Sequence, residues 1–282
     1  MKVLVTGSTG FIGGYVITEL LERGINVIAT STNITHATAK SWFPDVVYVE
    51  HDIQKPSIEN LFEKFEKPDA LIHLAWGKLD NFKDQVHLDE ILPKHELFLQ
   101  NLIANGLKDL TVIGTCLEYG MKEGELHEEM SPDPIIAYPI AKNKLRQFLD
   151  KFSSETSISL KWVRLFYMYG NGQSKKSILS QLDVALERND EVFNMSLGEQ
   201  QRDYLPVNEV AENIVIFALQ REINGIINCC SNIPITIKQL VLDHLKKKNK
   251  TIKLNLGYYP YTDYEPFKFW GNHKKQLKIK SL

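Results

Sequence analysis

Three glycines near the start of the chain constrain its fold more than any other feature of the sequence. Gly7, Gly10 and Gly13 follow a short β-rich run at residues 3–6 and open a stretch of helical periodicity at residues 11–23. Gly7 permits a tight turn, Gly10 lets a ligand approach the backbone, and Gly13 lets the helix pack against the strand. Because the first N–H groups of a helix carry partial positive charge, this order predicts a strand–loop–helix unit that holds the pyrophosphate of a dinucleotide.

The alternation of strand and helix continues through the first half of the chain. Further β-rich runs lie at residues 27–30, 46–49, 70–75, 111–114 and 160–166. Helical stretches lie between them at residues 58–65, 97–105 and 138–152, and Pro56 suits the first turn of the first of these. Strands that alternate with helices form parallel sheets covered on both faces. We therefore expect an α/β fold of the Rossmann type, with a doubly wound parallel sheet.

The pattern changes after about residue 170, where loops lengthen and aromatic residues gather at 258–261 and 264–270. A helix at residues 207–219 and a strand at 225–230 are still expected, so the chain returns to the sheet at about residues 204–230. The sequence thus predicts a dinucleotide-binding domain at residues 1–167. It also predicts a smaller, discontinuous substrate-binding lobe from residues 168–203 and 231–282.

Composition excludes several classes of protein. With 33 Lys and Arg against 35 Asp and Glu, the net charge of −2 gives no electrostatic reason to bind nucleic acid or an anionic membrane. The longest apolar run, residues 214–219, is far shorter than a membrane span, and no signal peptide is visible. Cys116, Cys229 and Cys230 lack metal-ligand spacing and are expected to be reduced thiols. We expect a cytoplasmic protein without a metal site.

The end of the chain is rich in lysine. The last forty residues hold ten lysines against three acidic residues. Such a run is typical of a solvated surface, and the alternative is a basic wall that faces a phosphorylated substrate.

A tyrosine and a lysine four residues apart form the second motif. Tyr138 and Lys142 lie one turn apart on the helix expected at residues 138–152. With ordinary pKa values of about 10 and about 10.4, neither group is reactive alone near neutral pH. An ammonium group beside the phenol, together with the positive nicotinamide ring of an oxidised dinucleotide, lowers the tyrosine pKa and prepares it for proton transfer. Taken alone, the pair also fits an incidental placement on an exposed helix.

Thr115 completes this motif at the end of the strand expected at residues 111–114. The glycine loop, Thr115, Tyr138 and Lys142 together resemble the extended short-chain dehydrogenase/reductase family of NAD(P)-dependent sugar-nucleotide epimerases, dehydratases and reductases, over nearly the whole chain. The resemblance implies that Thr115 hydrogen-bonds the reacting oxygen, Tyr138 exchanges its proton and Lys142 tunes Tyr138. It also implies a set of cofactor contacts: Gly7, Thr9, Gly10, Phe11, Ile12, Gly13, Ser31, Thr32, Asn33, Asp52, Ile53, Leu74, Ala75, Trp76, Tyr138 and Lys142.

Two parts of this set allow more than one interpretation: the histidine at the end of one strand and the polar residues at the end of another. The segment at residues 73–75 matches the family's fourth-strand motif, but His73 itself is equally well explained as a buried histidine at a strand end. The strand at residues 27–30 ends in Ser31, Thr32 and Asn33, without the carboxylate that would accept hydrogen bonds from the ribose of NAD and repel a 2′-phosphate. These side chains, with His36 and Lys40 near them, favour NADP(H) over NAD(H), although the arginine usual in NADP-binding relatives is missing.

The residues after Thr115 narrow the chemistry. Dehydratases of the family carry an Asp-Glu pair there, and related decarboxylases need a glutamate at position 117, whereas this chain has Cys116 and Leu117. Cys116 stands one position from the acid of the 3,5-epimerising reductases and is expected to be a buried thiol. The remaining reaction is hydride transfer at a carbonyl or alcohol.

Two further segments resemble substrate-binding motifs of the family. Residues 200–207 are similar to its R-D-[FY]-x-x-V segment, which implies that Arg202 binds the diphosphate of a nucleotide sugar; the alternative is a local ion pair with Asp203. Residues 164–170 are similar to R-x-x-N-[VI]-Y-G, with Tyr167 in place of Asn. Candidates for the sugar pocket, with ordinary packing as the alternative for the apolar ones, are Glu118, Phe166, Met168, Phe267 and Trp270.

The sequences of these motifs are most similar to those of nucleotide-sugar 4-ketoreductases of deoxysugar and O-antigen biosynthesis. It implies NADPH-dependent reduction of the C4 keto group of a nucleoside-diphospho-4-keto-6-deoxy sugar, such as dTDP-4-dehydro-6-deoxy-D-glucose to dTDP-D-fucose. One alternative is an NAD-dependent nucleotide-sugar 4-epimerase, and another is a non-catalytic dinucleotide-binding regulatory protein. By analogy with the family, residues 97–105 and 138–152 are expected to form a homodimer.

Overall fold

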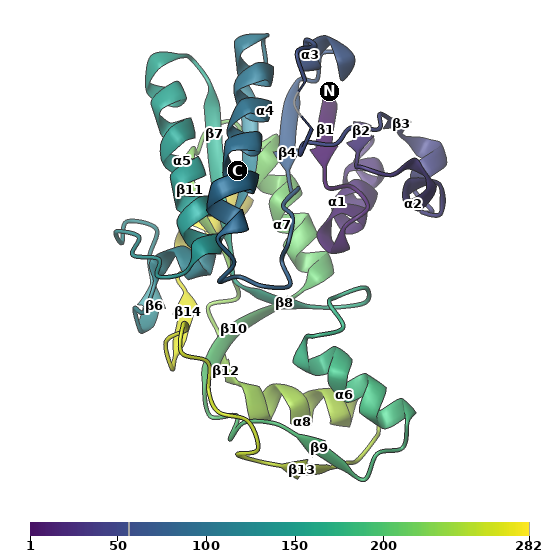
Figure 1. Cartoon of the computed structure of the whole chain (residues 1–282), viewed down its shortest axis with the longest axis vertical. Helices are drawn as coiled ribbons and strands as arrows, with labels where there is room; N and C mark the ends of the chain where they lie inside the picture. Colours follow the sequence, from purple (N-terminus) through teal and green to yellow (C-terminus); the bar gives the residue numbers. More distant parts are fainter. Residues whose placement is uncertain (56, 282) are drawn as a thin grey trace.

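A seven-stranded, wholly parallel sheet forms the centre of the computed structural model, which describes residues 1–55 and 57–281 (Figure 1). The strand order is β11-β7-β5-β4-β1-β2-β3. The strands are β1 (Lys2–Thr6), β2 (Asn26–Thr30), β3 (Val47–Tyr48), β4 (Ala70–His73), β5 (Asp109–Thr115), β7 (Ser159–Leu165) and β11 (Gly225–Cys229). The chain winds outward in both directions from β1 and β4, which confirms the Rossmann-type α/β fold. In such a sheet, ligands bind where the order reverses, at the carboxyl ends of the strands.

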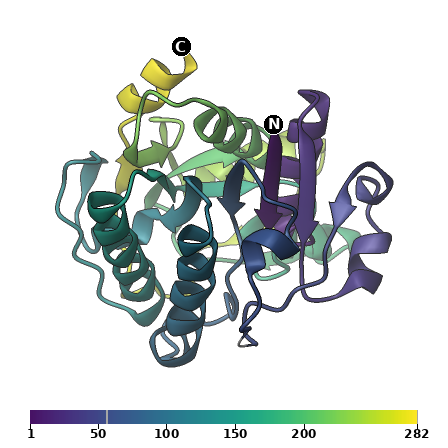
Figure 2. The same cartoon turned by 90° about the horizontal axis from the view of Figure 1, so that it is seen from above.

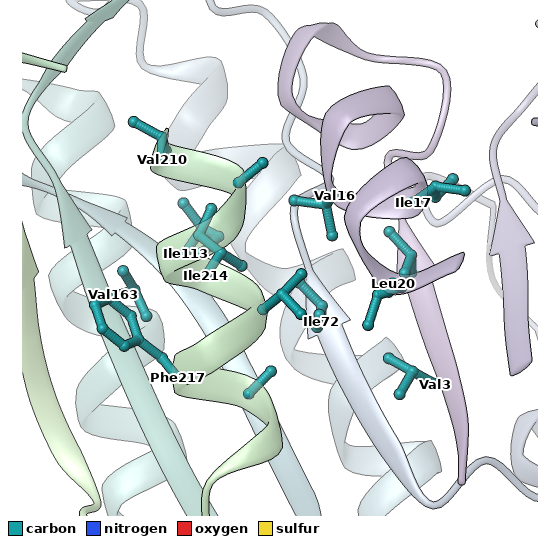
Figure 3. Close-up of a cluster of buried hydrophobic side chains, with 14 of the residues drawn as sticks. Val3, Val16, Ile17, Leu20, Ile72, Ile113, Val163, Val210, Ile214 and Phe217 are labelled. Atoms are coloured by element: carbon teal, nitrogen blue, oxygen red, sulfur yellow. The ribbon is translucent and has the colours of Figure 1, made fainter. Parts of the chain in front are cut away.

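Helices cover both faces of this sheet (Figure 2). Helices α1 (Phe11–Glu22) and α7 (Val207–Leu219) pack on one face, and α4 (Leu92–Ala104) and α5 (Ala137–Glu155) pack on the other. Alternate residues of a strand point to opposite faces, so Val3 and Val5 join the α1–α7 cluster while Leu4 joins the cluster under α4 and α5. Figure 3 shows the first cluster, where apolar side chains of both helices meet the sheet: Val16, Ile17, Leu20, Ile214 and Phe217.

A second group of elements lies below the carboxyl edge of the sheet in Figure 1. It contains the sheet β12-β10-β8 and the pairs β13-β9 and β14-β6. The strands are β6 (Gly124–Leu126), β8 (Tyr167–Tyr169), β9 (Val192–Asn194), β10 (Gln201–Pro206), β12 (Pro234–Thr236), β13 (Lys253–Asn255) and β14 (Phe269–Gly271). Helices α6 (Ile178–Glu187) and α8 (Ile237–Lys247) pack together there, and α9 (Lys274–Lys280) returns to the main sheet beside β11. The division into domains at residue 167 stays a prediction.

Several element boundaries differ from the expected ones. Helix α3 covers only Leu61–Lys64. It begins after Asn60, whose side chain caps it by accepting a hydrogen bond from the Glu63 N–H at 3.1 Å. Pro56 lies outside the described residues. Helix α4 begins five residues before residue 97 and continues directly from a π-helical turn at His87–Ile91. Among the described residues, no helix combines the length and the apolar character that crossing a membrane requires.

The glycine loop joins β1 to α1 with very little free space. Gly7 has a φ of 67°, in the left-handed region that favours glycine. A Cβ on Gly13 would lie 2.3 Å from the carbonyl oxygen of Gly7. At Gly14, the next residue of the helix, a Cβ would meet only Trp42 Nε1, at 3.5 Å. A side chain at Gly13 would therefore collide with the loop, whereas a side chain at the adjacent Gly14 would have free space.

We predict that alanine at these two positions changes stability in opposite directions. Gly13→Ala should lower the free energy of unfolding by about 1–3 kcal/mol, because the Gly7 carbonyl must move. Gly14→Ala should raise it by about 0.5–1 kcal/mol, since alanine is the better helix former and the space is free. Urea unfolding of the three proteins measures both changes. Equal effects at the two positions would show that the loop does not pack as described.

Candidate active site

A cavity of about 460 Å³ follows the carboxyl edge of β1, β2 and β4. Its walls bring together most of the expected cofactor contacts: Gly7, Thr9, Gly10, Phe11, Ile12, Gly13, Ser31, Thr32, Asp52, Ile53, Leu74, Ala75 and Trp76. Added Cβ atoms on Gly7 or Gly13 would collide with neighbouring backbone, and the buried Thr30 hydroxyl has no hydrogen-bond partner among the described residues. A glycine cradle at a helix N-terminus, with a polar wall at the end of β2, fits a nicotinamide dinucleotide.

Asn33 is placed differently from the sequence prediction. It does not line the cavity, because its Oδ1 accepts hydrogen bonds from the N–H groups of Thr35 at 2.8 Å and His36 at 3.3 Å. It therefore caps the short helix α2 (Ile34–Thr38). The cap uses only the amide oxygen of Asn33, so the expected contact, in which the amide group donates to a cofactor phosphate, stays a prediction.

His73 is a buried histidine at the end of β4, as the second of its two explanations from the sequence predicts. Its Nδ1 lies 2.9 Å from the Thr6 hydroxyl and its Nε2 lies 2.8 Å from Nδ1 of His95. Burial lowers the pKa of His73 to about 3, so the ring is neutral near neutral pH. The ring thus ties β4 to β1 and α4 under the floor of the cofactor cavity.

Thr115, Tyr138 and Lys142 line one neighbouring cavity of about 290 Å³. Thr115 ends β5, Tyr138 stands in the first turn of α5, and Lys142 lies one turn further along. This cavity and the cofactor cavity are continuous because both are lined by Ile12, Leu74, Trp76, Leu79 and Ile113. Thr115 on β5 and, 23 and 27 positions further along the chain, Tyr138 and Lys142 on α5 therefore line a cavity that opens into the glycine cradle.

Lys142 is buried in an unusual setting for an amine. Its Nζ donates a hydrogen bond to the Ile113 carbonyl at 2.8 Å and lies 4.0 Å from the centre of the Trp76 ring. Burial lowers the pKa of Lys142 from near 10.5 to about 7, although the Glu118 carboxylate acts in the opposite direction. The amine therefore exchanges its proton near neutral pH.

Tyr138 is held by aromatic contacts. Its ring stacks on Phe82 at 4.9 Å and lies 5.4 Å from the ring of His87. Burial raises the pKa of Tyr138, and the negative charge of Glu118 adds to this rise. The protein's own groups thus keep the phenol protonated, and the lowered pKa expected with a charged lysine and an oxidised nicotinamide beside the phenol stays a prediction.

Glu118 does not line the cavity that holds Thr115, and its predicted sugar contact is wrong. The side chain is fully buried in the 3₁₀ turn η3 (Cys116–Tyr119). Its Oε1 accepts hydrogen bonds from the Thr115 N–H at 2.9 Å and Trp162 Nε1 at 3.0 Å, and its Oε2 accepts one from Arg164 Nε at 2.9 Å. A buried carboxylate requires such partners, and here they fix the turn that positions Thr115.

The sugar side of the cavity contains some of the expected residues. Phe166 and Met168 line it together with Cys116, Leu117 and Tyr167. Burial raises the pKa of Cys116, as expected of an inert thiol. Phe267 and Trp270 do not line this cavity: Phe267 is exposed, and Trp270 belongs to β14.

Arg202 is buried beside this cavity, with a partner that the sequence did not indicate. Its Nε and Nη2 donate to Oε2 of Glu265 at 3.2 and 2.9 Å, and its guanidinium carbon lies 5.9 Å from the ring of Tyr167. Asp203 instead accepts hydrogen bonds from the N–H groups of Ser231, Asn232 and Gly271. The alternative of a local ion pair between Arg202 and Asp203 is therefore wrong. The guanidinium of Arg202 instead donates two hydrogen bonds to the carboxylate of Glu265.

Sequence reasoning missed Phe82, His87 and Glu265. Phe82 and His87 lie between β4 and α4 in a segment without periodicity, and they reach Tyr138 only through the tertiary fold. Glu265 belongs to the aromatic segment near the C-terminus. Its negative charge in a lysine-rich region was the only feature of the sequence that could have pointed to a role in the site.

A phosphate-binding glycine loop at the switch point of a Rossmann sheet, continuous with a Thr–Tyr–Lys set, defines an enzyme that works beside a nicotinamide dinucleotide. Residues 3–230 match the NAD dependent epimerase/dehydratase family, and the chain belongs to this enzyme family.

Relatives agree with this membership along the whole chain. The chain is 30% identical over 272 residues to the dTDP-6-deoxy-L-talose 4-dehydrogenase (NAD(+)) of Aggregatibacter actinomycetemcomitans, covering 96% of this chain and 99% of that protein. It is 23% identical over 263 residues to the dTDP-4-dehydro-6-deoxyglucose reductase of Escherichia coli, covering 88% and 82%. The UDP-glucuronic acid 4-epimerase of Bacillus cereus, solved with UDP-glucuronic acid and NAD, has the same fold, with a TM-score of 0.83 at 20% identity over 99% and 92% of the chains. The preference for NADP(H) expected from the sequence finds no support in these relatives.

The pKa of Lys142 predicts a pH-dependent stability difference between the wild type and Lys142→Met. The unfolded lysine keeps its proton up to about pH 10.5, whereas the folded one loses it at about pH 7. Folding therefore carries the full cost of a buried ammonium below pH 7, and this cost disappears as the pH rises to 10.5. The free energy of unfolding of the wild type should rise relative to that of Lys142→Met by about 1.4 kcal/mol per pH unit across this interval.

Urea unfolding at pH 6, 7, 8 and 9 measures this difference. Lys151→Met, at an exposed position of the same helix, is the matched control and should show no such trend. A flat difference between pH 7 and pH 9 for Lys142→Met would mean that the amine keeps its proton in the folded protein.

Proposed function

We propose that this protein is a nucleotide-sugar oxidoreductase that interconverts the C4 keto and C4 hydroxyl forms of a dTDP-linked 6-deoxyhexose. The observation that carries the proposal is the convergence of Thr115, Tyr138 and Lys142 on one cavity that continues into the dinucleotide cradle. The names of two relatives, a dTDP-6-deoxy-L-talose 4-dehydrogenase and a dTDP-4-dehydro-6-deoxyglucose reductase, support position 4 and the dTDP-linked 6-deoxy sugar.

The chain's own residues supply proton transfer and orientation. The nicotinamide supplies or accepts the hydride when it is bound. Tyr138, whose pKa is raised by burial, is protonated near neutral pH and donates its proton to the C4 oxygen of a keto sugar. Thr115 donates a hydrogen bond to the same oxygen and so stabilises the charge that develops on it. Lys142 exchanges a proton near neutral pH and replenishes the proton that Tyr138 gives up. A protonated phenol favours the reduction as the working direction.

Other reactions lack the necessary groups at the position after Thr115. Water elimination needs an acid and a base there, whereas Cys116 has a raised pKa and Leu117 is apolar. The apolar wall of Phe166 and Met168 suits a 6-deoxy sugar, whose C6 methyl group needs no hydrogen-bond partner.

We predict that Tyr138→Phe lowers kcat about 10²–10⁴-fold, because it removes the proton donor and leaves the ring contacts in place. The assay measures oxidation of NADH or NADPH with the 4-keto forms of dTDP-D-fucose and dTDP-6-deoxy-L-talose, and NMR identifies the product. Tyr15→Phe, which removes a hydroxyl that donates to the Asn171 carbonyl, is the control and should leave kcat unchanged.

Near-normal turnover of Tyr138→Phe would refute the role of this tyrosine. A 4-epimerase would convert one dTDP-sugar into its C4 epimer without net consumption of dinucleotide. A regulatory protein would bind dinucleotide and turn over neither sugar.

We further propose that the substrate diphosphate binds Arg202 and displaces Glu265 from it. The Arg202 side chain is 4% exposed, and its guanidinium carbon lies 5.9 Å from the ring of Tyr167, which lines the reaction cavity. A nucleotide sugar spanning both sites would bring its charged part to Arg202. An Arg fork binds phosphate oxygens in the same bidentate manner as a carboxylate. Glu265 therefore competes with the substrate for this residue.

This competition predicts that Glu265→Gln lowers the KM for the sugar nucleotide roughly fivefold, with kcat changed less than about twofold. A neutral amide holds the guanidinium less strongly than a carboxylate and yields more easily to a diphosphate. Asp263→Asn is the matched control, because Asp263 lies in the same segment and pairs with the exposed Lys83 at 2.8 Å. An unchanged or higher KM for Glu265→Gln would place the diphosphate elsewhere.

Two coarser predictions from the sequence also belong to this proposal. We propose that the enzyme acts in the cytoplasm and forms a homodimer through α4 and α5.

A further inference from the structure

Thr6, His73 and His95 form a buried chain of hydrogen bonds beneath the cofactor cavity, and the proposed mechanism does not use it. Thr6 ends β1, His73 ends β4 and His95 stands in the first turn of α4. The Thr6 hydroxyl lies 2.9 Å from His73 Nδ1, and His73 Nε2 lies 2.8 Å from His95 Nδ1. A neutral imidazole has one nitrogen that donates and one that accepts, so one end of this chain fixes the position of every proton along it.

The hydroxyl proton of Thr6 determines that order. The Ala75 N–H donates to the Thr6 oxygen at 3.2 Å, and among the described residues the hydroxyl itself has one acceptor, Nδ1 of His73. Because Thr6 donates to Nδ1, His73 carries its own proton on Nε2 and donates it to Nδ1 of His95. The proton of His95 therefore stands on Nε2.

Burial keeps both imidazoles in the neutral form that this order requires. It lowers the pKa of His73 to about 3 and the pKa of His95 well below its usual value. Near neutral pH each ring therefore holds a single proton, and the direction of the chain is retained.

The N–H at Nε2 of His95 has no acceptor within the described part of the chain, although the residue is only 1% exposed. A buried donor without a partner is costly, so nearly all such groups in proteins are hydrogen-bonded. His95 lines the cofactor cavity. A ligand in this cavity thus meets a donor whose proton is already in place.

The neighbours of His95 indicate which part of a dinucleotide it meets. Its ring lies 4.6 Å from the ring of Trp76, which lines both the cofactor cavity and the reaction cavity. Ser31 and Thr32, at the end of β2, lie where a dinucleotide-binding sheet places the adenosine ribose. With the pyrophosphate at the glycine loop and the nicotinamide toward Tyr138, the second ribose of the dinucleotide would lie beside Trp76.

We propose that His95 is a cofactor-binding residue whose Nε2–H donates a hydrogen bond to a hydroxyl oxygen of the ribose that carries the nicotinamide. Thr6 and His73 are its positioning residues, because they fix which nitrogen of His95 holds the proton. A donor fixed in advance loses little conformational freedom when the ligand binds. The proposal rests on the dinucleotide site of the proposed function and not on the identity of the sugar.

Binding of two fragments of the dinucleotide tests this contact. ADP-ribose contains the second ribose, whereas ADP ends at the diphosphate, and isothermal titration calorimetry on the full chain gives the Kd of each. In His95→Asn the amide oxygen can still accept from His73 Nε2–H, but no N–H remains at the position of Nε2. The Kd of ADP-ribose should rise about three- to tenfold, while the Kd of ADP changes less than about twofold.

Two further variants make the result specific. His95→Gln can place an amide N–H near the position of Nε2 and should keep the Kd of ADP-ribose within about twofold of the wild type. His127→Asn is the matched control and should change neither Kd, because His127 is 39% exposed, pairs with Glu125 and lines neither cavity. Thermal unfolding followed by circular dichroism verifies that each variant is folded.

NMR of isotope-labelled histidine nitrogens tests the order of protons directly, because protonated and unprotonated ring nitrogens differ in chemical shift. In the wild type, His73 and His95 should each carry a proton on Nε2 and none on Nδ1. Thr6→Val removes the hydroxyl donor, so it should populate the form with a proton on Nδ1 of His73 and weaken ADP-ribose more than ADP.

An unchanged Kd of ADP-ribose in folded His95→Asn overturns the proposal. So does an equal rise for ADP and ADP-ribose, which would place the contact outside the second ribose, and so does a proton on Nδ1 of His95 in the wild type. Neither measurement uses a sugar substrate, so a failed sugar assay would contradict the proposed reaction and leave this contact standing. A wild type that binds neither fragment would contradict both.

Discussion

The buried carboxylate of Glu118 organises the reaction centre. An ionised carboxylate without partners is very costly inside a protein, and here the Thr115 N–H, Trp162 Nε1 and Arg164 Nε all donate to it. These bonds join the turn after β5 to β7 and hold Thr115 in the wall of the cavity that also contains Tyr138 and Lys142. The same negative charge helps raise the pKa of Tyr138 and partly offsets the effect of burial on Lys142. One interaction thus sets both the geometry and the proton chemistry of the site.

Burial and aromatic packing complete this proton chemistry. Lys142 lies over Trp76 and Tyr138 stacks on Phe82, so both polar atoms are held in an apolar surrounding that weakens their ionised forms. The consequence is a protonated phenol that lines the same cavity as an amine that titrates near neutral pH. Such a pair is suited to giving a proton to a carbonyl oxygen, because neither group has to be charged for long in a desolvated pocket.

Another carboxylate, Glu265, occupies the place where the proposed function puts an anionic group of the substrate. It accepts two hydrogen bonds from the guanidinium of Arg202. Because Glu265 is only 13% exposed, a substrate diphosphate would have to displace it to reach Arg202.

The sequence by itself determined the Rossmann order of strands and helices and the glycine loop, and it predicted the set of Thr115, Tyr138 and Lys142 that the fold brings to one cavity. These features follow from local patterns: side-chain period, turn residues and the spacing of one helical turn. Only the tertiary structure decided the roles of Glu118 and Arg202, because each depends on which partner comes within hydrogen-bond distance. Their decisive ion pairs join residues 46 and 63 positions apart in sequence, and no local pattern specifies which charges the fold brings together.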